Sequence, residues 1–179
     1  LAKVFTENNY FSMASHNNYG IYYNRSEMLP TLGYTFYDAV GLNAYDNVPD
    51  SDVIDHVKWI MYEYEKVFSF WVTYNGHQPY SMDTLSEDML KYYDLVNKRY
   101  PDMPEPEKIY FAKNMDLDRG LASLLKDYEN NDLLDDLVIM IYGDHFPKGL
   151  FENKEDYRSM CETNGIEFES CFSTPLIIW

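Results

Sequence analysis

Short apolar runs alternate with longer amphipathic stretches along this chain of 179 residues. The clearest runs, Val67–Tyr74 and Leu137–Tyr142, are rich in aromatic or branched apolar residues and predict buried strands. Between them, 84–99 and 107–130 carry apolar residues at helical spacing. Strands that alternate with helices form units in which parallel strands are joined by helices across the sheet. The sequence therefore predicts an α/β fold, with a mostly parallel central sheet flanked by helices on both faces.

The remaining elements are shorter and follow the same alternation. Because Leu137–Tyr142 is apolar at every position, we expect a central strand of the parallel sheet there. Gly33 is expected to end a helix, since glycine adopts the left-handed backbone of a helix C-terminus without strain. The other predicted elements are helices at 1–8, 26–32 and 153–164, a helix capped by Ser51 or Asp52, and strands at Tyr10–Ser15, Phe36–Ala39 and 174–179.

The formal net charge of −16 excludes several classes of partner. A nucleic-acid partner is not expected, because phosphate backbones are bound by Lys and Arg. No basic amphipathic stretch of the kind that lies on membranes is present. If the substrate is an anion, a metal ion or a placed Arg must locally offset the negative field of the protein.

The ends of the chain predict a partial domain. No stretch approaches the roughly 20 apolar residues of a membrane span. The chain starts at Leu1 rather than Met, and 174–179 reads as a core strand, a poor place for a natural end. We therefore expect residues 1–179 to be one domain truncated at both ends. Cys161 and Cys171 can pair in an oxidising compartment, but their spacing alone does not decide it.

Three of the four histidines follow predicted strands. His16, His77 and His145 each come within three residues of a strand end, whereas His56 lies within a helix and is expected at the surface. Ligands of open α/β sheets bind beyond the carboxyl ends of the strands. The sequence therefore predicts one site that contains His16, His77 and His145.

Each candidate side chain has two interpretations, one as part of a functional site and one as an ordinary structural residue. Asp144 and His145 combine a carboxylate with an imidazole, a pair of donors that suits Zn²⁺ or Mn²⁺. Alternatively, Asp144 caps a helix and His145 is an exposed neighbour. His77 is a donor to a substrate oxygen or a proton shuttle, or a loop His bonded to backbone. Arg25 offers two parallel donors to an oxyanion, or is a solvated Arg at a helix start.

The candidate residues belong to a series of short sequence motifs that together span nearly the whole chain. They are His16–Arg25 followed by Leu32-Gly33-Tyr34 and Asp38, then Gly76–Tyr80, Asp118–Leu121, Leu134–His145 and 174–178. Together they resemble the sulfatase-type domain of lipoteichoic acid synthases and related cell-envelope phosphoglycerol transferases, within the alkaline-phosphatase superfamily. Tyr23 stands where this family usually has Trp, so the resemblance implies that an aromatic wall of the pocket is kept.

The resemblance implies roles for the six candidates. Asp144 and His145 would be ligands of a divalent metal, usually Mn²⁺ in this branch, with Mg²⁺, Zn²⁺ and Ca²⁺ as alternatives. The phosphoglycerol pocket would be lined by His16, Tyr23, Arg25 and His77. The family's nucleophilic Thr and a further Glu ligand lie well before the segment that begins at His16, so no catalytic nucleophile is expected in this chain. The fragment alone is therefore expected to be inactive and to bind metal weakly.

The resemblance also implies a substrate and a location. The parent protein would transfer phosphoglycerol from an anionic glycerophospholipid or a glycerophosphate polymer, through a covalent phosphoglycerol-Thr intermediate. It would work on the extracellular face of a bacterial membrane, anchored through parts outside this chain, or as a released cell-surface domain. Two alternatives stay open: a sulfatase or phosphoethanolamine transferase of the same superfamily, and a degenerate extracellular domain that binds glycans or partners without catalysis.

Overall fold

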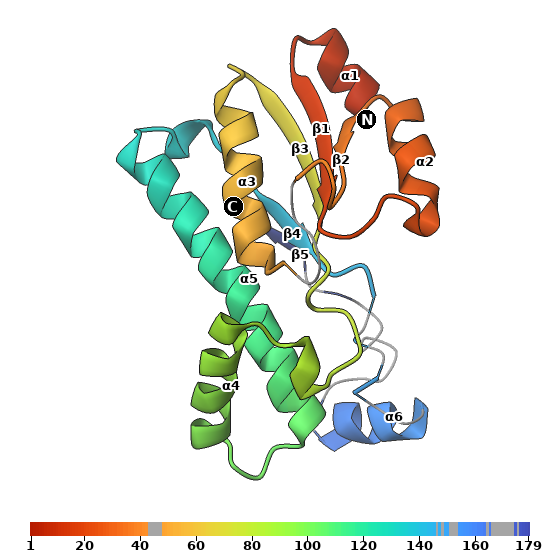
Figure 1. Cartoon of the computed structure of the whole chain (residues 1–179), viewed down its shortest axis with the longest axis vertical. Helices are drawn as coiled ribbons and strands as arrows, with labels where there is room; N and C mark the ends of the chain where they lie inside the picture. Colours follow the sequence, from red (N-terminus) through yellow and green to blue (C-terminus); the bar gives the residue numbers. More distant parts are fainter. Residues whose placement is uncertain are drawn as a thin grey trace.

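Three parallel strands form the central sheet of the computed structural model (Figure 1). They are β1 (Phe11–His16), β2 (Thr35–Tyr37) and β3 (Val67–Val72), in the order β2-β1-β3. β1 pairs with β3 along its whole length, from Phe11 opposite Val67 to His16 opposite Val72. The structure describes residues 1–42, 48–145, 147, 149–150, 154–163, 165, 174 and 176–179. Within these residues, the predicted parallel sheet is confirmed.

Helices cover both faces of this sheet (Figure 1). On one face Phe68 of β3 stacks on Phe5 of α1 (Ala2–Glu7), with ring centroids 4.1 Å apart, and α2 (Arg25–Thr31) lies beside β2. On the other face Met13 packs with Val57 of α3 (Asp50–Tyr62). Successive strand residues point to opposite faces, so β1 and β3 each supply apolar side chains to both layers. The predicted α/β arrangement with helices on both sides is therefore present.

A long helix extends the fold beyond the sheet. Helix α5 (Glu105–Asn130) packs along α3 at one end and against α4 (Glu87–Arg99) at the other (Figure 1). Ile54, Leu124 and Tyr128 form a second buried cluster where α3 meets α5. The remaining elements are α6 (Lys154–Thr163), β4 (Met140–Tyr142), β5 (Leu176–Ile178), and the short 3₁₀ turns η1 (Tyr22–Asn24), η2 (Met82–Thr84) and η3 (Leu134–Asp136).

The predicted central strand at Leu137–Tyr142 is wrong in two respects. Its strand portion, β4, pairs antiparallel with β5 in a separate two-stranded sheet. It is also not buried, since Met140 is 57% exposed and Ile178 of β5 is 62% exposed. The expected core strand at 174–179 is therefore exposed as well. An apolar run reports a preference for burial, but it carries no information on the direction of pairing or on which surface covers it.

Helix boundaries depart from the sequence predictions by a few residues. Helix α3 begins at Asp50 after Pro49, without a side-chain cap, so the predicted cap by Ser51 or Asp52 is wrong. Helix α5 begins at Glu105, two residues early, because Pro106 fits the first turn, where no N–H is needed. Gly33 follows α2 with φ of +100°, as expected for its position.

The predicted pairing of the two cysteines lies outside the described residues. Cys171 is among the residues that the structure does not describe, and of Cys161 only its place in α6 is described, so their pairing stays a prediction. Among the helices that are described, none is both long enough and apolar enough to cross a membrane.

Gly120 marks the closest approach of α5 to α3, and a methyl group has no room there. A Cβ at Gly120 would lie 2.7 Å from Cδ1 of Ile54 and 2.8 Å from Cα of Ser51. Replacing a helical Gly by Ala normally stabilises a protein by about 1 kcal/mol. We expect Gly120→Ala to destabilise the fold by about 1–3 kcal/mol instead, because the backbone at Ser51 must move. Urea-induced unfolding measures this difference.

The control is Ser123→Ala on an exposed position of the same helix. It should leave stability unchanged or raise it slightly, since Ala has the higher helix propensity. A gain in stability for Gly120→Ala similar to that of the control would contradict the close packing of α3 on α5.

Candidate functional site

The loop that follows β1 is tied to the end of β2 by Asp38. The Asp38 carboxylate accepts hydrogen bonds from the backbone N–H of Gly20 at 3.0 Å and from those of Val40 and Gly41 at 3.1 Å. A Cβ at Gly20 would collide with Oγ of Ser26 and lie 2.9 Å from Cε1 of Phe36, so any other residue would force these side chains to move. The loop that carries Tyr23 and Arg25 is therefore held at the carboxyl edge of the sheet.

Tyr23 and Arg25 lie together at the start of α2. Tyr23 and Asn24 have φ of 55° and 53°, a left-handed conformation that costs about 1 kcal/mol or more per non-glycine residue. The Arg25 guanidinium stacks over the Tyr23 ring at 4.8 Å and donates to the Tyr22 carbonyl at 3.3 Å. Tyr23 itself is 82% exposed. A strained turn thus presents an aromatic face and a cation with further donors to solvent.

His16, the last residue of β1, is buried with one ring nitrogen committed. Its Nδ1 lies 2.7 Å from the Val72 carbonyl, which can only accept, so Nδ1 carries the proton. Burial lowers the pKa of His16, and the charge of Arg25 lowers it further, against opposing contributions from the Val72 bond and Asp38. The ring is therefore neutral near pH 7, and Nε2 is its acceptor. The influence of Arg25 also shows that these two predicted residues lie within electrostatic reach of each other.

Four aromatic rings connect His16 to the predicted metal ligands. His16 meets the Tyr74 ring edge to face at 5.9 Å, Tyr74 stacks on His77 at 5.7 Å, and His77 meets His145 edge to face at 6.4 Å. The three histidines come from three separate segments: β1, the loop after β3, and the loop after β4. We refer to His16, Tyr74, His77 and His145 as the ring array. It brings together the three histidines that the sequence predicted to share a site.

Asp144 and His145 form a pair at the end of the ring array. Oδ1 of Asp144 lies 3.7 Å from Nε2 of His145, and their side chains are 77% and 48% exposed. Bonds from Zn²⁺ to such ligands are about 2.0–2.2 Å, so a single ion can bridge this separation. Within the described part of the chain, no group of three or more His, Cys, Asp or Glu side chains is placed to hold a metal. Among the described residues, the pair can therefore supply two metal donors.

Sequence reasoning missed a buried polar network behind the ring array. Asp50, the first residue of α3, accepts from Nδ2 of Asn17 at 2.7 Å and from the backbone N–H groups of Tyr74 and Asn75 at 3.1 and 3.2 Å. Asn17 follows His16, and Asn75 follows Tyr74, so the network joins the ends of β1 and β3. An Asp at a helix start is common at the surface, and no local signal distinguishes Asp50 from such a residue.

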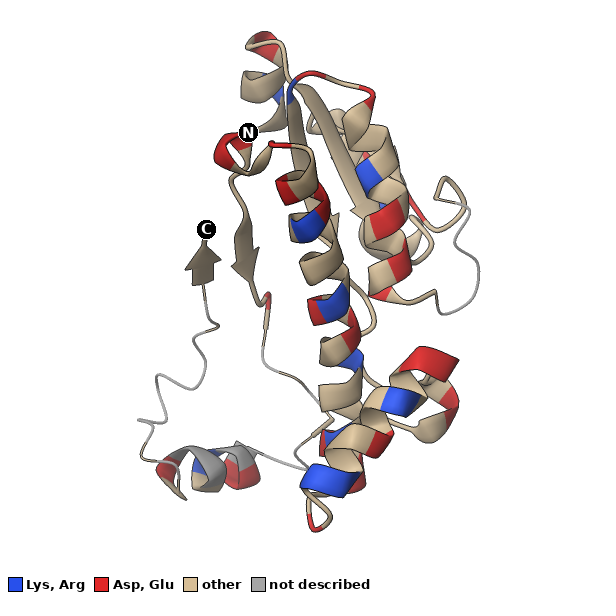
Figure 2. Cartoon of the chain, turned by 90° about the vertical axis from the view of Figure 1, so that its left-hand side faces the viewer, with Lys and Arg blue, Asp and Glu red and all other residues tan. Residues whose placement is uncertain are grey.

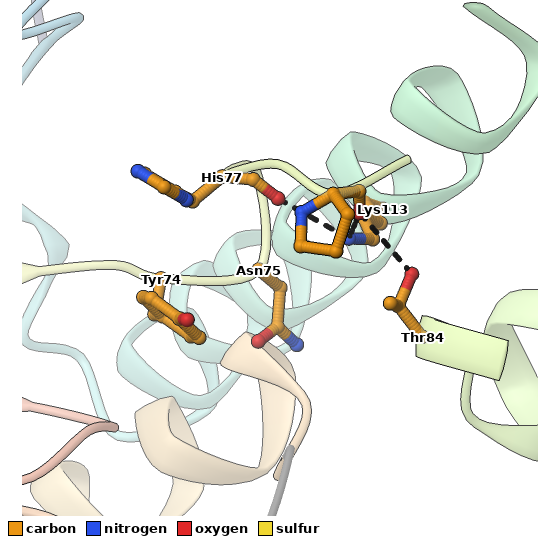
Figure 3. Close-up of a pocket in the computed structure, with 6 residues that line it drawn as sticks. Tyr74, Asn75, His77, Thr84 and Lys113 are labelled. Carbon is orange, nitrogen blue, oxygen red and sulfur yellow. Dashed lines mark hydrogen bonds between the residues drawn. The ribbon is translucent and has the colours of Figure 1, made fainter. Parts of the chain in front are cut away.

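A small pocket lies between this network and α5. Its lining includes Tyr74, Asn75, His77, Thr84 and Lys113, together with Pro79 (Figure 3). Lys113 is only 4% exposed, and its Nζ donates to the carbonyls of His77 and Pro79 at 3.2 and 3.0 Å. Burial lowers the pKa of Lys113, opposed by the charges of Asp50 and Asp83. Lys113 is a second site residue that the sequence analysis did not identify.

Asp50 should make the stability of the chain depend on pH. Burial is the main cause that raises the Asp50 pKa from 3.8 to about 6. Between these values the folded state binds more protons than the unfolded state, so stability falls as pH rises. Relative to Asp50→Asn, the wild-type chain should gain up to about 3 kcal/mol as pH falls from about 7 to about 4. Urea unfolding across this pH range measures the difference.

The exposed carboxylate of Asp136 is the control for this titration. Asp136→Asn should follow the pH dependence of the wild type, because its carboxyl group faces water. Parallel pH profiles for the wild type and Asp50→Asn would show that Asp50 is not held in the buried, proton-binding state.

Known proteins share both sequence and fold with this chain. No family model matches the sequence. Lipoteichoic acid synthase 1 of Bacillus subtilis (strain 168) is 26% identical over 170 residues, which are 88% of this chain and 24% of that protein. The chain thus spans about a quarter of the length of this curated relative.

Two solved structures contain the same arrangement of elements. The lipoteichoic acid synthase LtaP from Listeria monocytogenes superimposes with a TM-score of 0.69 at 17% identity, covering 99% of this chain and 45% of that structure. The phosphoglycerol transferase GacH of Streptococcus pyogenes, in complex with sn-glycerol-1-phosphate, gives 0.56 at 18% identity, covering 95% and 43%. The chain therefore has the fold of part of a lipoteichoic acid synthase-like, sulfatase-type domain.

Proposed function

We propose that this chain forms one side of the active site of a cell-envelope phosphoglycerol transferase. The observation that carries the proposal is the ring array, which gathers His16, His77 and His145 at the carboxyl edge of the parallel sheet, with the charge of Arg25 acting on His16. The substrate would be an anionic glycerophospholipid or a glycerophosphate polymer. The solved complex of the similar protein GacH with sn-glycerol-1-phosphate supports a substrate of this chemical class.

The geometry suggests how the four pocket residues would bind phosphoglycerol. Arg25 would donate two parallel hydrogen bonds to phosphate oxygens, held in direction by its stacking on Tyr23. Nδ1 of His16 and Nδ1 of His77 lie 2.7 and 2.6 Å from backbone carbonyls, so each ring would present Nε2 to the substrate. The exposed ring of Tyr23 would pack against the glycerol carbons.

Asp144 and His145 would hold a divalent metal ion, with Mn²⁺ proposed and Mg²⁺, Zn²⁺ or Ca²⁺ as alternatives. Their oxygen and nitrogen donors suit such an ion, and the 3.7 Å between them allows both to bind it. When bound, the ion would supply positive charge beside the phosphate and favour the ionised form of an attacking hydroxyl. The two residues of this chain would orient and hold it, with further ligands from outside the described residues.

The nucleophile is proposed to lie outside this chain. A Thr hydroxyl would attack the phosphorus, release the lipid alcohol, and later pass the phosphoglycerol group to an acceptor hydroxyl. This chain would contribute binding and orientation of the phosphate to both steps. We further propose that the protein works at the extracellular face of a bacterial membrane, with any membrane anchor also outside these residues.

Metal binding tests the proposed ligands directly in this chain. Titration with Mn²⁺, followed by the electron paramagnetic resonance signal of the free ion, should show weak binding to the wild-type chain. Asp144→Ala should weaken it by more than about 10-fold, because even the loss of an outer-shell partner costs about 10–100-fold. Asp136→Ala, which removes another exposed carboxylate, is the control. Equal Mn²⁺ affinity of the two variants would remove Asp144 from the site.

Turnover tests the pocket in a protein that contains both this chain and the nucleophile. Arg25→Ala should lower kcat/KM for glycerophosphate diesters by about 10- to 100-fold, because a hydrogen bond to a charged group contributes about 1.5–3 kcal/mol. Arg99→Ala is a matched control, since Arg99 also stacks on a tyrosine ring, that of Tyr100 at 5.8 Å, but on α4.

Three outcomes separate the proposal from its alternatives. Unchanged kcat/KM in Arg25→Ala would remove Arg25 from the pocket. Higher activity on aryl sulfates than on glycerophosphate diesters would assign the protein to the sulfatases. Binding of glycans without turnover of any phosphodiester or sulfate ester would support a non-catalytic domain.

A further inference from the structure

The first two residues of the loop from Tyr74 to Pro79 donate hydrogen bonds to a buried carboxylate, that of Asp50. Oδ1 of Asp50 accepts from the backbone N–H of Tyr74, and Oδ2 accepts from that of Asn75. Asp50 is 2% exposed. Its hydrogen bonds therefore fix the orientation of two consecutive peptide groups at the point where the chain leaves β3.

The second half of the same loop accepts hydrogen bonds from a buried ammonium group. Nζ of Lys113, from α5, donates to the carbonyls of His77 and Pro79 (Figure 3). The carboxylate thus binds N–H groups and the ammonium binds carbonyl groups of a single six-residue loop. His77 is thus held at its own carbonyl, and its ring stacks on Tyr74 at 5.7 Å.

We infer that Asp50 and Lys113 are positioning residues that clamp the loop 74–79 and thereby set the direction of the His77 ring. The clamp also reaches β1, because Asn17 donates to Asp50 at 2.7 Å and follows His16. One carboxylate therefore sets the positions of both His16 and His77. The role of the clamp in substrate binding rests on the proposed function, whereas the clamp itself does not.

The bonding partners of these two residues distinguish a clamp from ordinary stabilisation. Within the described residues, neither Asp50 nor Lys113 forms a salt bridge, although both are charged groups removed from water. Lys58, also buried, pairs instead with Asp55 and Asp127. Burying a charge costs free energy that apolar packing would avoid. The bonds of Asp50 and Lys113 to backbone groups restrict the conformation of this loop, which apolar side chains cannot do.

The chain offers a matched control for each member of the clamp. Asp116 is fully buried and accepts hydrogen bonds from the N–H and Oγ of Ser51 rather than from the loop 74–79. Lys108 is 6% exposed on the same helix as Lys113 and donates to Asn97 and to the Pro101 carbonyl. Asp116→Asn and Lys108→Met therefore remove comparable buried charges elsewhere in the fold.

The experiment measures the ring signals of His77 by ¹H–¹³C nuclear magnetic resonance in the 179-residue chain. In the wild type, stacking on Tyr74 should displace these signals through the ring current of the tyrosine. Asp50→Asn and Lys113→Met should each lose most of this displacement, and the signal of the exposed His56 should stay in place. Asp116→Asn and Lys108→Met should keep the His77 displacement, even where their melting temperatures fall.

Either of two results would overturn the clamp: an unchanged His77 displacement in Asp50→Asn and Lys113→Met, or an equal loss in the two controls. If Asp50→Asn does not fold, Lys113→Met and its control decide the question alone. Turnover in a protein that includes the nucleophile provides a separate test. Loss of the clamp should lower kcat by about 10- to 100-fold, as expected for a displaced binding group. A lost His77 displacement with unchanged turnover would retain the clamp and remove His77 from the substrate pocket, whereas absence of any such turnover in the wild type would contradict the proposed function and leave the clamp in place.

Discussion

The parallel pairing of β1 with β3 brings the two histidine-bearing loops of the buried part of the candidate site to one edge of the sheet. Because the two strands run in the same direction and in register, His16 and Val72 end at the same edge, and the loops beyond them emerge side by side. The bond from His16 to the Val72 carbonyl and the bonds from Asp50 to both loops depend on this alignment. An antiparallel pair would place the two histidine-bearing loops at opposite ends of the sheet.

The positively charged residues of the candidate site lie within a strongly negative chain. With a net charge of −16, the chain taken as a whole would repel the proposed anionic substrate. Figure 2 shows acidic residues distributed over several helices on the face in view. Arg25 and Lys113 place positive charge at the carboxyl edge of the sheet, within this negative chain. His16 is neutral near pH 7 and contributes a polar ring nitrogen. The proposed metal ion at Asp144 and His145 would add further positive charge at the same edge.

The site combines a buried half with a more exposed half. His16 and Asp50 are buried between the sheet and the covering helices, while Asp144 and His145 follow a short strand of the separate antiparallel pair. The stacking of Tyr74 on His77, and the contact of His77 with His145, connect the two halves. This arrangement makes the loop after β3 central, since it touches both the buried network and the proposed metal ligands. The clamp inferred for Asp50 and Lys113 acts on this loop.

Periodicity and local chemistry in the sequence determined the α/β class, most elements and the histidines at strand ends, because these depend on residues close together in the chain. Only the tertiary structure showed that Leu137–Tyr142 supplies an exposed antiparallel strand, since pairing direction depends on a distant partner. It alone revealed Asp50 and Lys113 as site residues, because their partners lie 24 to 36 residues away. A lone Asp or Lys carries no local sign of burial. Its environment is decided by which backbone groups the fold brings to it.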